Sequence, residues 1–82
     1  KLLNLNLAPN PFSNKSILNL PYYKNDHLEI YIYNSVGQLE KIYNHVHPPT
    51  FELNKDNLKS GLYFLEVYDN KNRIGITKFE IK

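Results

Sequence analysis

The chain has 82 residues, no cysteine and no methionine, and its ten basic and eight acidic residues leave a formal net charge of +2. This length fits one small domain, and the lack of cysteine excludes a disulfide framework and a thiolate metal site. The charges are interspersed without a basic run, which argues against nucleic-acid binding, and no apolar stretch is long enough for a membrane-spanning helix. Because the chain begins at Lys1 and lacks methionine, we expect it to be excised from a longer protein.

Apolar and polar residues alternate through most of the chain, which is the period of half-buried strands. The clearest inward row is Leu28, Ile30 and Ile32, and no stretch keeps a helical period over three turns. About seven short strands predict an all-β fold, an immunoglobulin-like antiparallel β-sandwich that fills residues 1–82. In chain order, the alternating segments are Leu3 to Leu7, Ser16 to Leu20, Leu28 to Tyr33, Leu39 to Tyr43, Phe51 to Leu53, Leu62 to Tyr68 and Ile74 to Ile81.

Turn-forming residues separate the predicted strands. Pro9 and Pro11 lack backbone donors, so the chain cannot lie in a central ladder there. Gly37 is free to take a positive φ in the hairpin connection that begins at Asn34. The other predicted connections are an exposed loop or sheet crossover at Pro48-Pro49 and a tight turn over residues 69–72.

The last predicted hairpin requires an irregular register. A regular ladder places Val67 opposite Ile74, and it then leaves the apolar Phe79 and Ile81 on the outer face. One extra residue in a strand reverses the alternation beyond it. We therefore predict a β-bulge or a bend near Thr77-Lys78.

Few residues suggest chemistry. His45 and His47 would share one face of a strand, but a metal site needs at least a third ligand, and an exposed loop beside the two prolines is the alternative. Residues 69–72 lack the glycine and the distal glutamate of a calcium loop. No serine lies in a nucleophile-elbow pattern and no Gly-rich phosphate loop is present. We predict neither a catalytic site nor a cofactor.

Tyrosine is abundant, with seven residues. Tyr31 and Tyr33 lie on the strand face opposite the inward isoleucines, and we expect Tyr43 to lie across the hairpin from them. An exposed aromatic row can bind a sugar or a protein, whereas tyrosine also forms ordinary cross-strand pairs. The alternation is compatible with both interpretations.

Four short motifs follow one another along the chain: Pro-Asn-Pro, Tyr-Asn-x-x-Gly-Gln, Leu-x-x-Gly-x-Tyr and lysines in the last strand. In this order and spacing they resemble the type A C-terminal sorting domain of the Bacteroidetes type IX secretion system, over about residues 7–82. Two positions depart from that family, since Ala8 stands where tyrosine is common and Phe79 where a second lysine is common. The matching residues are Pro9, Asn10, Pro11, Tyr33, Asn34, Gly37, Gln38, Leu58, Gly61, Tyr63, Lys78 and Lys82.

The resemblance implies a non-catalytic secretion signal for an upstream passenger protein. The implied partners are the outer-membrane translocon and a sortase-like peptidase that commonly cuts upstream of the domain. The implied route runs through the periplasm to the cell surface or the medium. We expect receptor contact on the final strand, where Lys78, Glu80 and Lys82 alternate outward.

Tyr31 and Tyr33, together with Glu80, form a further candidate docking face. We expect a monomer that binds no nucleic acid and does not insert into a membrane. The alternatives are an immunoglobulin-like accessory module that binds carbohydrate or a partner protein, and a passive spacer. The tyrosine face would serve the accessory module, whereas a spacer would tolerate changes of its outward residues.

Overall fold

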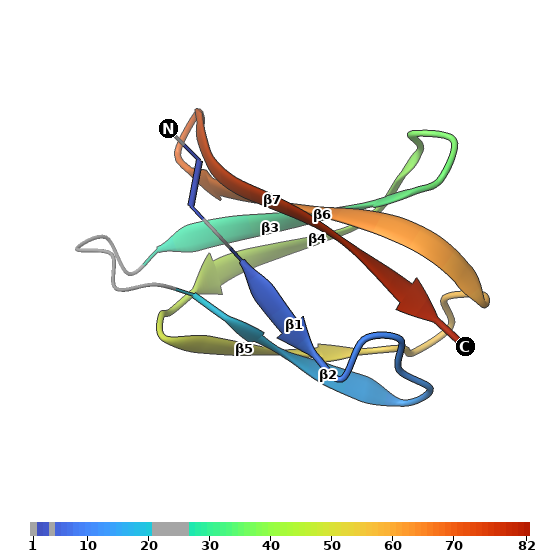
Figure 1. The fold of residues 1–82 in the computed structure, drawn as a ribbon. Helices are drawn as coiled ribbons and strands as arrows, with labels where there is room; N and C mark the ends of the chain where they lie inside the picture. Colours follow the sequence, from blue (N-terminus) through green and yellow to red (C-terminus); the bar gives the residue numbers. More distant parts are fainter. Residues whose placement is uncertain (1, 4, 21–26) are drawn as a thin grey trace.

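The computed structural model describes residues 2–3, 5–20 and 27–82, and seven strands within these ranges form two antiparallel sheets packed face to face (Figure 1). One sheet has the strand order β1-β2-β5, and the other has the order β4-β3-β6-β7. The predicted all-β sandwich is confirmed. The strands are β1 (Asn6–Ala8), β2 (Lys15–Asn19), β3 (Leu28–Asn34), β4 (Leu39–Val46), β5 (Thr50–Asn54), β6 (Gly61–Asp69) and β7 (Asn72–Ile81).

The core between the sheets consists largely of the residues that the alternation points inward. Leu28, Ile30 and Ile32 of β3 are at most 1% exposed, and β6 contributes every second residue in the same way. Ser16 is fully buried among these apolar side chains, and its hydroxyl donates to the carbonyl oxygen of Pro9 at 2.7 Å. That hydrogen bond offsets the cost of burying the hydroxyl.

The predicted connections are confirmed. The segment with Pro48-Pro49 leads from β4 in one sheet to β5 in the other, so it is a crossover. Gly37 takes a φ of 88° in the hairpin between β3 and β4, and Asn70 takes a φ of 55° in the turn between β6 and β7. Glycine and asparagine tolerate this left-handed region better than other residues.

The predicted bulge in the last hairpin exists, but its predicted position is wrong. The register shifts between Arg73, which faces Tyr68, and Gly75, which faces Val67, so the extra residue is Ile74. Beyond it the ladder is regular and carries Phe79 and Ile81 inward. A glycine at position 75 fits this arrangement, because a Cβ there would lie 2.9 Å from Cδ1 of Leu5. The N-terminal segment therefore leaves no room for a side chain at position 75, next to the bulge.

Tyr43 does not share a face with Tyr31 and Tyr33, contrary to the prediction. The ladder between β3 and β4 shifts at Glu40, which is an extra residue in β4, and Tyr43 consequently faces Ile30. Its ring contacts the Phe51 ring on the neighbouring sheet, with 4.9 Å between the ring centroids. The bulge turns Tyr43 toward the core edge because it reverses the alternation after Glu40.

Candidate functional site

The Pro-Asn-Pro segment lies along the outer edge of β7. Asn10 imitates a neighbouring strand there: its Oδ1 accepts from the backbone N–H of Glu80 at 2.9 Å, and its Nδ2 donates to the carbonyl oxygen of Lys78 at 3.3 Å. Phe12 then donates its N–H to the Glu80 carbonyl at 3.0 Å and accepts from the Lys82 N–H at 2.9 Å. The first motif therefore covers an edge that would otherwise offer unpaired backbone groups to another chain.

Asn34 folds the hairpin between β3 and β4. Its Oδ1 accepts from the backbone N–H groups of Val36 at 3.1 Å and Gln38 at 3.0 Å. Its Nδ2 donates to Oε1 of Gln38 at 2.9 Å and to Oε2 of Glu40 at 3.0 Å. Gly37 closes the turn with an N–H that donates to the Asn34 carbonyl at 3.0 Å. The side-chain amide of Asn34 in the second motif is thus fully engaged in hydrogen bonds within its own hairpin.

The Leu-x-x-Gly-x-Tyr motif shapes the segment that enters β6. Leu58 is 5% exposed and belongs to the core. Gly61 has a φ of 145°, a backbone conformation that residues with a side chain rarely adopt. The Tyr63 hydroxyl donates to the carbonyl oxygen of Lys59 at 2.6 Å and closes the segment into a loop. The third motif is therefore also built from internal contacts.

Three aromatic rings join the first and third motifs through β7. The Tyr63 ring stacks on the Phe79 ring with centroids 5.4 Å apart, and the Phe79 ring lies 5.8 Å from that of Phe12. Phe79 is 1% exposed, so a core residue stands where the resemblance led us to expect a second lysine. The alternation did not predict this link, although an aromatic residue directly after Pro11 was a signal for it.

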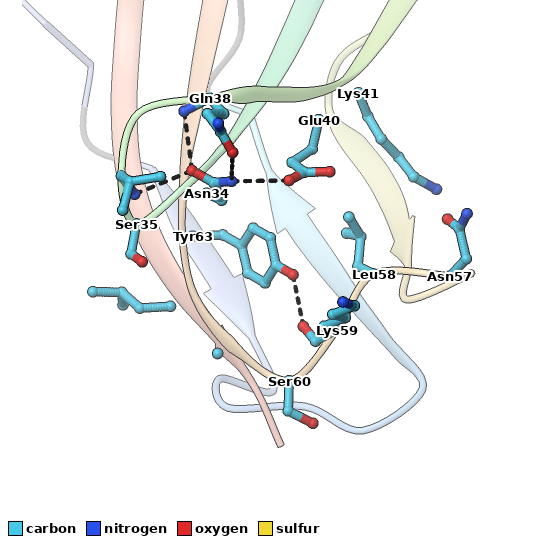
Figure 2. Close-up of a pocket in the computed structure, with 13 residues that line it drawn as sticks. Asn34, Ser35, Gln38, Glu40, Lys41, Asn57, Leu58, Lys59, Ser60 and Tyr63 are labelled. Atoms are coloured by element: carbon cyan, nitrogen blue, oxygen red, sulfur yellow. Dashed lines mark hydrogen bonds between the residues drawn. The ribbon is translucent and has the colours of Figure 1, made fainter.

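The three motifs meet at one end of the sandwich, at the right in Figure 1, which we call the motif end: loops 9–14, 35–38 and 55–60 and the end of β7. The Ser60 hydroxyl donates to the Lys82 carbonyl at 2.6 Å and fixes the last strand there. A groove of about 560 Å³ lies between the hairpin and residues 57–63 (Figure 2). Figure 2 shows Asn34 and Gln38 on one wall and Leu58 to Ser60 on the other. The hydrogen bonds drawn there fix both walls.

A family model described as the secretion system C-terminal sorting domain matches residues 6–82. The chain belongs to this family. No curated protein shows a significant match. The chain is thus a C-terminal sorting signal for type IX secretion, of a family not known for catalysis, as the sequence motifs predicted. Such a signal implies interaction with the secretion system and a passenger protein, which reaches the cell surface or the medium.

The last strand of the sorting domain presents the predicted polar residues to solvent. Lys78, Glu80 and Lys82 are exposed, and the first two lie opposite Phe64 and Leu62 of β6. A second hollow beside this strand is lined by Asn10, Pro11, Leu62, Lys78, Phe79 and Glu80. In the described part of the chain, no helix is long and apolar enough to cross a membrane.

Tyr31 and Tyr33 of the sorting domain are half-buried on the outer face of the four-stranded sheet. The Tyr31 ring packs edge-to-face with the Tyr68 ring at 5.1 Å, and its hydroxyl donates to Oε1 of Glu29 at 3.4 Å. The Glu29 carboxylate raises the pKa of Tyr31, whereas burial is the main cause that raises the pKa of Tyr33. These tyrosines thus form cross-strand contacts within the outer face.

The fold brings a third histidine to the predicted pair. The His27 ring lies 5.6 Å from the His45 ring and 5.7 Å from the His47 ring. His45 sits at the bulge where the ladder between β3 and β4 shifts, with a φ of 57°. Across residues 2–3, 5–20 and 27–82, no three His, Cys, Asp or Glu side chains are arranged to hold a metal ion. The geometry therefore gives the metal interpretation no support.

Alkaline pH is expected to destabilise the sorting domain. Burial raises the pKa of Tyr43 above the ordinary 10.0, and the hydrogen bond to Asp56 raises the pKa of Lys41. In both cases the folded state holds its proton to higher pH than the unfolded state does. The free energy of unfolding is therefore intact below a pH of about 10 and falls as the pH rises further. Urea unfolding at about pH 8 and about pH 11 measures the difference.

A Tyr43→Phe variant is the control for this pH dependence. The buried Tyr43 hydroxyl has no hydrogen-bond partner among the described residues, so its removal should leave the stability at pH 8 unchanged or slightly increased. The loss at alkaline pH should become smaller, because one of the raised pKa values is gone. A urea midpoint that rises between pH 8 and pH 11 in the unmodified domain would contradict the prediction.

Proposed function

We propose that the outer-membrane translocon of the type IX system reads this domain as a folded tag, and that the surface it reads lies beside the motif end. The supporting observation is that motifs spread from Pro9 to Tyr63 in the sequence lie at one end of the sandwich (Figure 1), where Asn10 and Tyr63 contact the end of β7. Their side chains are held mainly by contacts within the domain. An unfolded tail would therefore not display the same surface.

The proposed route follows from this role. The passenger folds in the periplasm, the translocon engages the tag, and a sortase-like peptidase cuts upstream of it. The domain acts as a ligand of this machinery rather than as a catalyst. The comparison with the family favours this reading over an accessory binding module.

The test is a fusion of residues 1–82 behind a signal peptide and a fluorescent protein, expressed in a bacterium with a type IX system. We expect fluorescence at the cell surface or in the medium of the parent strain, and retention in a strain that lacks the translocon. The fluorescent protein without the domain is the control. Retention of the fusion in both strains, with the domain folded, would overturn the proposal.

Removal of residues from Ile76 onward should also abolish export, but this variant does not separate folding from recognition. The deletion removes Phe79 and Ile81, which are each 1% exposed in the core. Loss of two such side chains costs more than a small domain tolerates. Single substitutions at exposed positions are therefore the sharper test of recognition.

A further inference from the structure

The outer face of the four-stranded sheet carries most of the exposed apolar side chains. Among the described residues, seven large apolar side chains are exposed, and four of them point outward from this sheet while a fifth, Val36, lies at the tip of its first hairpin. Large apolar side chains that gather on one exposed face mark candidate interaction sites in soluble proteins. The four on the sheet are Leu39 (48% exposed), Ile42 (47%), Leu62 (43%) and Ile76 (38%).

The charges on this face divide into two groups. Directly opposite Ile76, Glu66 is already used, since it accepts from the Tyr68 hydroxyl at 3.3 Å and from Nη1 of Arg73 at 2.8 Å. Next to the motif end, Lys78 and Lys82 have no ion-pair partner among the described residues. The available charge beside the apolar side chains is therefore mainly positive, with Glu80 between the two lysines.

The first three family motifs are poorly placed to contact a receptor, because their polar side chains are already engaged. The Asn34 amide is used in its own turn, the Tyr63 hydroxyl in its own loop, and Asn10 on the backbone of β7. These side chains hold the motif end together, and few of their hydrogen-bonding groups are left to contact a receptor. Recognition must then rely on neighbouring outward side chains.

We infer that the receptor of the secretion machinery covers the outer face of the four-stranded sheet beside the motif end, which we call the receptor face: Leu62, Phe64, Ile76, Lys78 and Lys82. The inference rests on the proposed function and specifies its partner. The receptor surface that fits has an apolar centre and carboxylates at its border, which pair with the lysines.

Other occupants fit this face less well. A second copy packed on it symmetrically would place the unpaired lysines of both copies in one interface, where an excess of like charge is unfavourable. A sugar binds best to flat exposed aromatic rings, but here the exposed groups are aliphatic and the hydroxyls of Tyr31 and Tyr68 are engaged with carboxylates. A protein surface suits exposed leucine and isoleucine better.

The first experiment compares two isoleucines in the fluorescent fusion. Ile76 on the receptor face is 38% exposed, and Ile17 on the outer face of the other sheet is 37% exposed. Both lie in strands, so Ile76→Ser and Ile17→Ser should cost similar stability. We expect Ile76→Ser to lower export about tenfold, the effect of losing one well-packed interface side chain, and Ile17→Ser to leave it unchanged.

The second experiment reverses one charge at an outward position. We expect Lys78→Glu to lower export several-fold, because the introduced carboxylate would face the carboxylates of the receptor. Lys71→Glu, in the turn between β6 and β7, makes the same change of net charge and should have no effect. Thermal melting of each purified fusion shows whether the domain stays folded.

The outcomes separate this inference from the proposed function. Export of the unmodified fusion together with normal export of Ile76→Ser and Lys78→Glu would overturn the receptor face and leave the sorting role intact. Equal losses in the receptor-face variants and their controls would overturn it as well. If the Ile76→Ser variant does not fold, the Lys78→Glu variant is the deciding test, since the side chain of Lys78 is exposed. Failure of the unmodified fusion to leave the cell would remove both proposals.

Discussion

Replacement of Phe79 by alanine is expected to destabilise the sorting domain by about 3–5 kcal/mol, the usual cost of removing a buried phenylalanine ring. The ring is 1% exposed and contacts both Tyr63 and Phe12, so the substitution breaks the link between two motifs. A domain of this size has a free energy of unfolding on the order of 4–12 kcal/mol, and a large part of it would be lost. Urea unfolding followed by circular dichroism measures the change.

Phe64→Ala provides the matched control for the stability measurement in the same sheet. Phe64 is half-buried on the outer face, opposite Lys78, so its removal leaves no cavity in the core and should cost clearly less. If the translocon reads a folded tag, Phe79→Ala should also reduce export of the fusion at the growth temperature. Equal stability of the Phe79→Ala and unmodified domains would show that the aromatic link does not hold the motif end together.

Replacement of Asn34 by alanine is expected to cost about 1–2 kcal/mol, because its side chain makes four hydrogen bonds within the turn. The cost is limited because water can reach the exposed turn and satisfy the backbone groups that lose their partner. Thermal melting should show a lower midpoint. Amide hydrogen exchange should speed up at Val36 and Gln38, the two N–H groups that the Asn34 Oδ1 accepts from.

Asn44→Ala is the control for this variant, since Asn44 lies exposed on β4 beyond the hairpin. Its removal should change the free energy of unfolding by no more than about 0.5 kcal/mol. Equal effects of the two substitutions would mean that the turn does not depend on the Asn34 side chain. The Tyr-Asn-x-x-Gly-Gln motif would then need an explanation other than folding.

Alternation alone predicted the strands and the inward rows of this chain. Leu28, Ile30 and Ile32 were assigned to the core from their spacing, and they are buried in the fold. The turns were also predictable, because Gly37 and Asn70 belong to the residue types that accept positive φ. These features are local, since they depend on residues close together in the chain.

The register between neighbouring strands could not be predicted from the local sequence pattern alone. The need for a bulge in β7 followed from the positions of Phe79 and Ile81, but the sequence could not place it at Ile74. That position suits the contact between Gly75 and Leu5, two segments far apart in the sequence. The bulge at Glu40, which turns Tyr43 away from Tyr31, was missed because the hairpin alternates well without it.

The fold class, the strands and the family could be inferred without a structure, because periodicity and turn residues are local features and the motifs keep their order and spacing. The packed fold was needed to see that Asn10 lies on the edge of β7, that the rings of Phe12, Tyr63 and Phe79 pack together, and which side chains remain outward beside them. These contacts join residues up to 70 positions apart. They depend on how two sheets pack and where each ladder shifts, which no local pattern specifies.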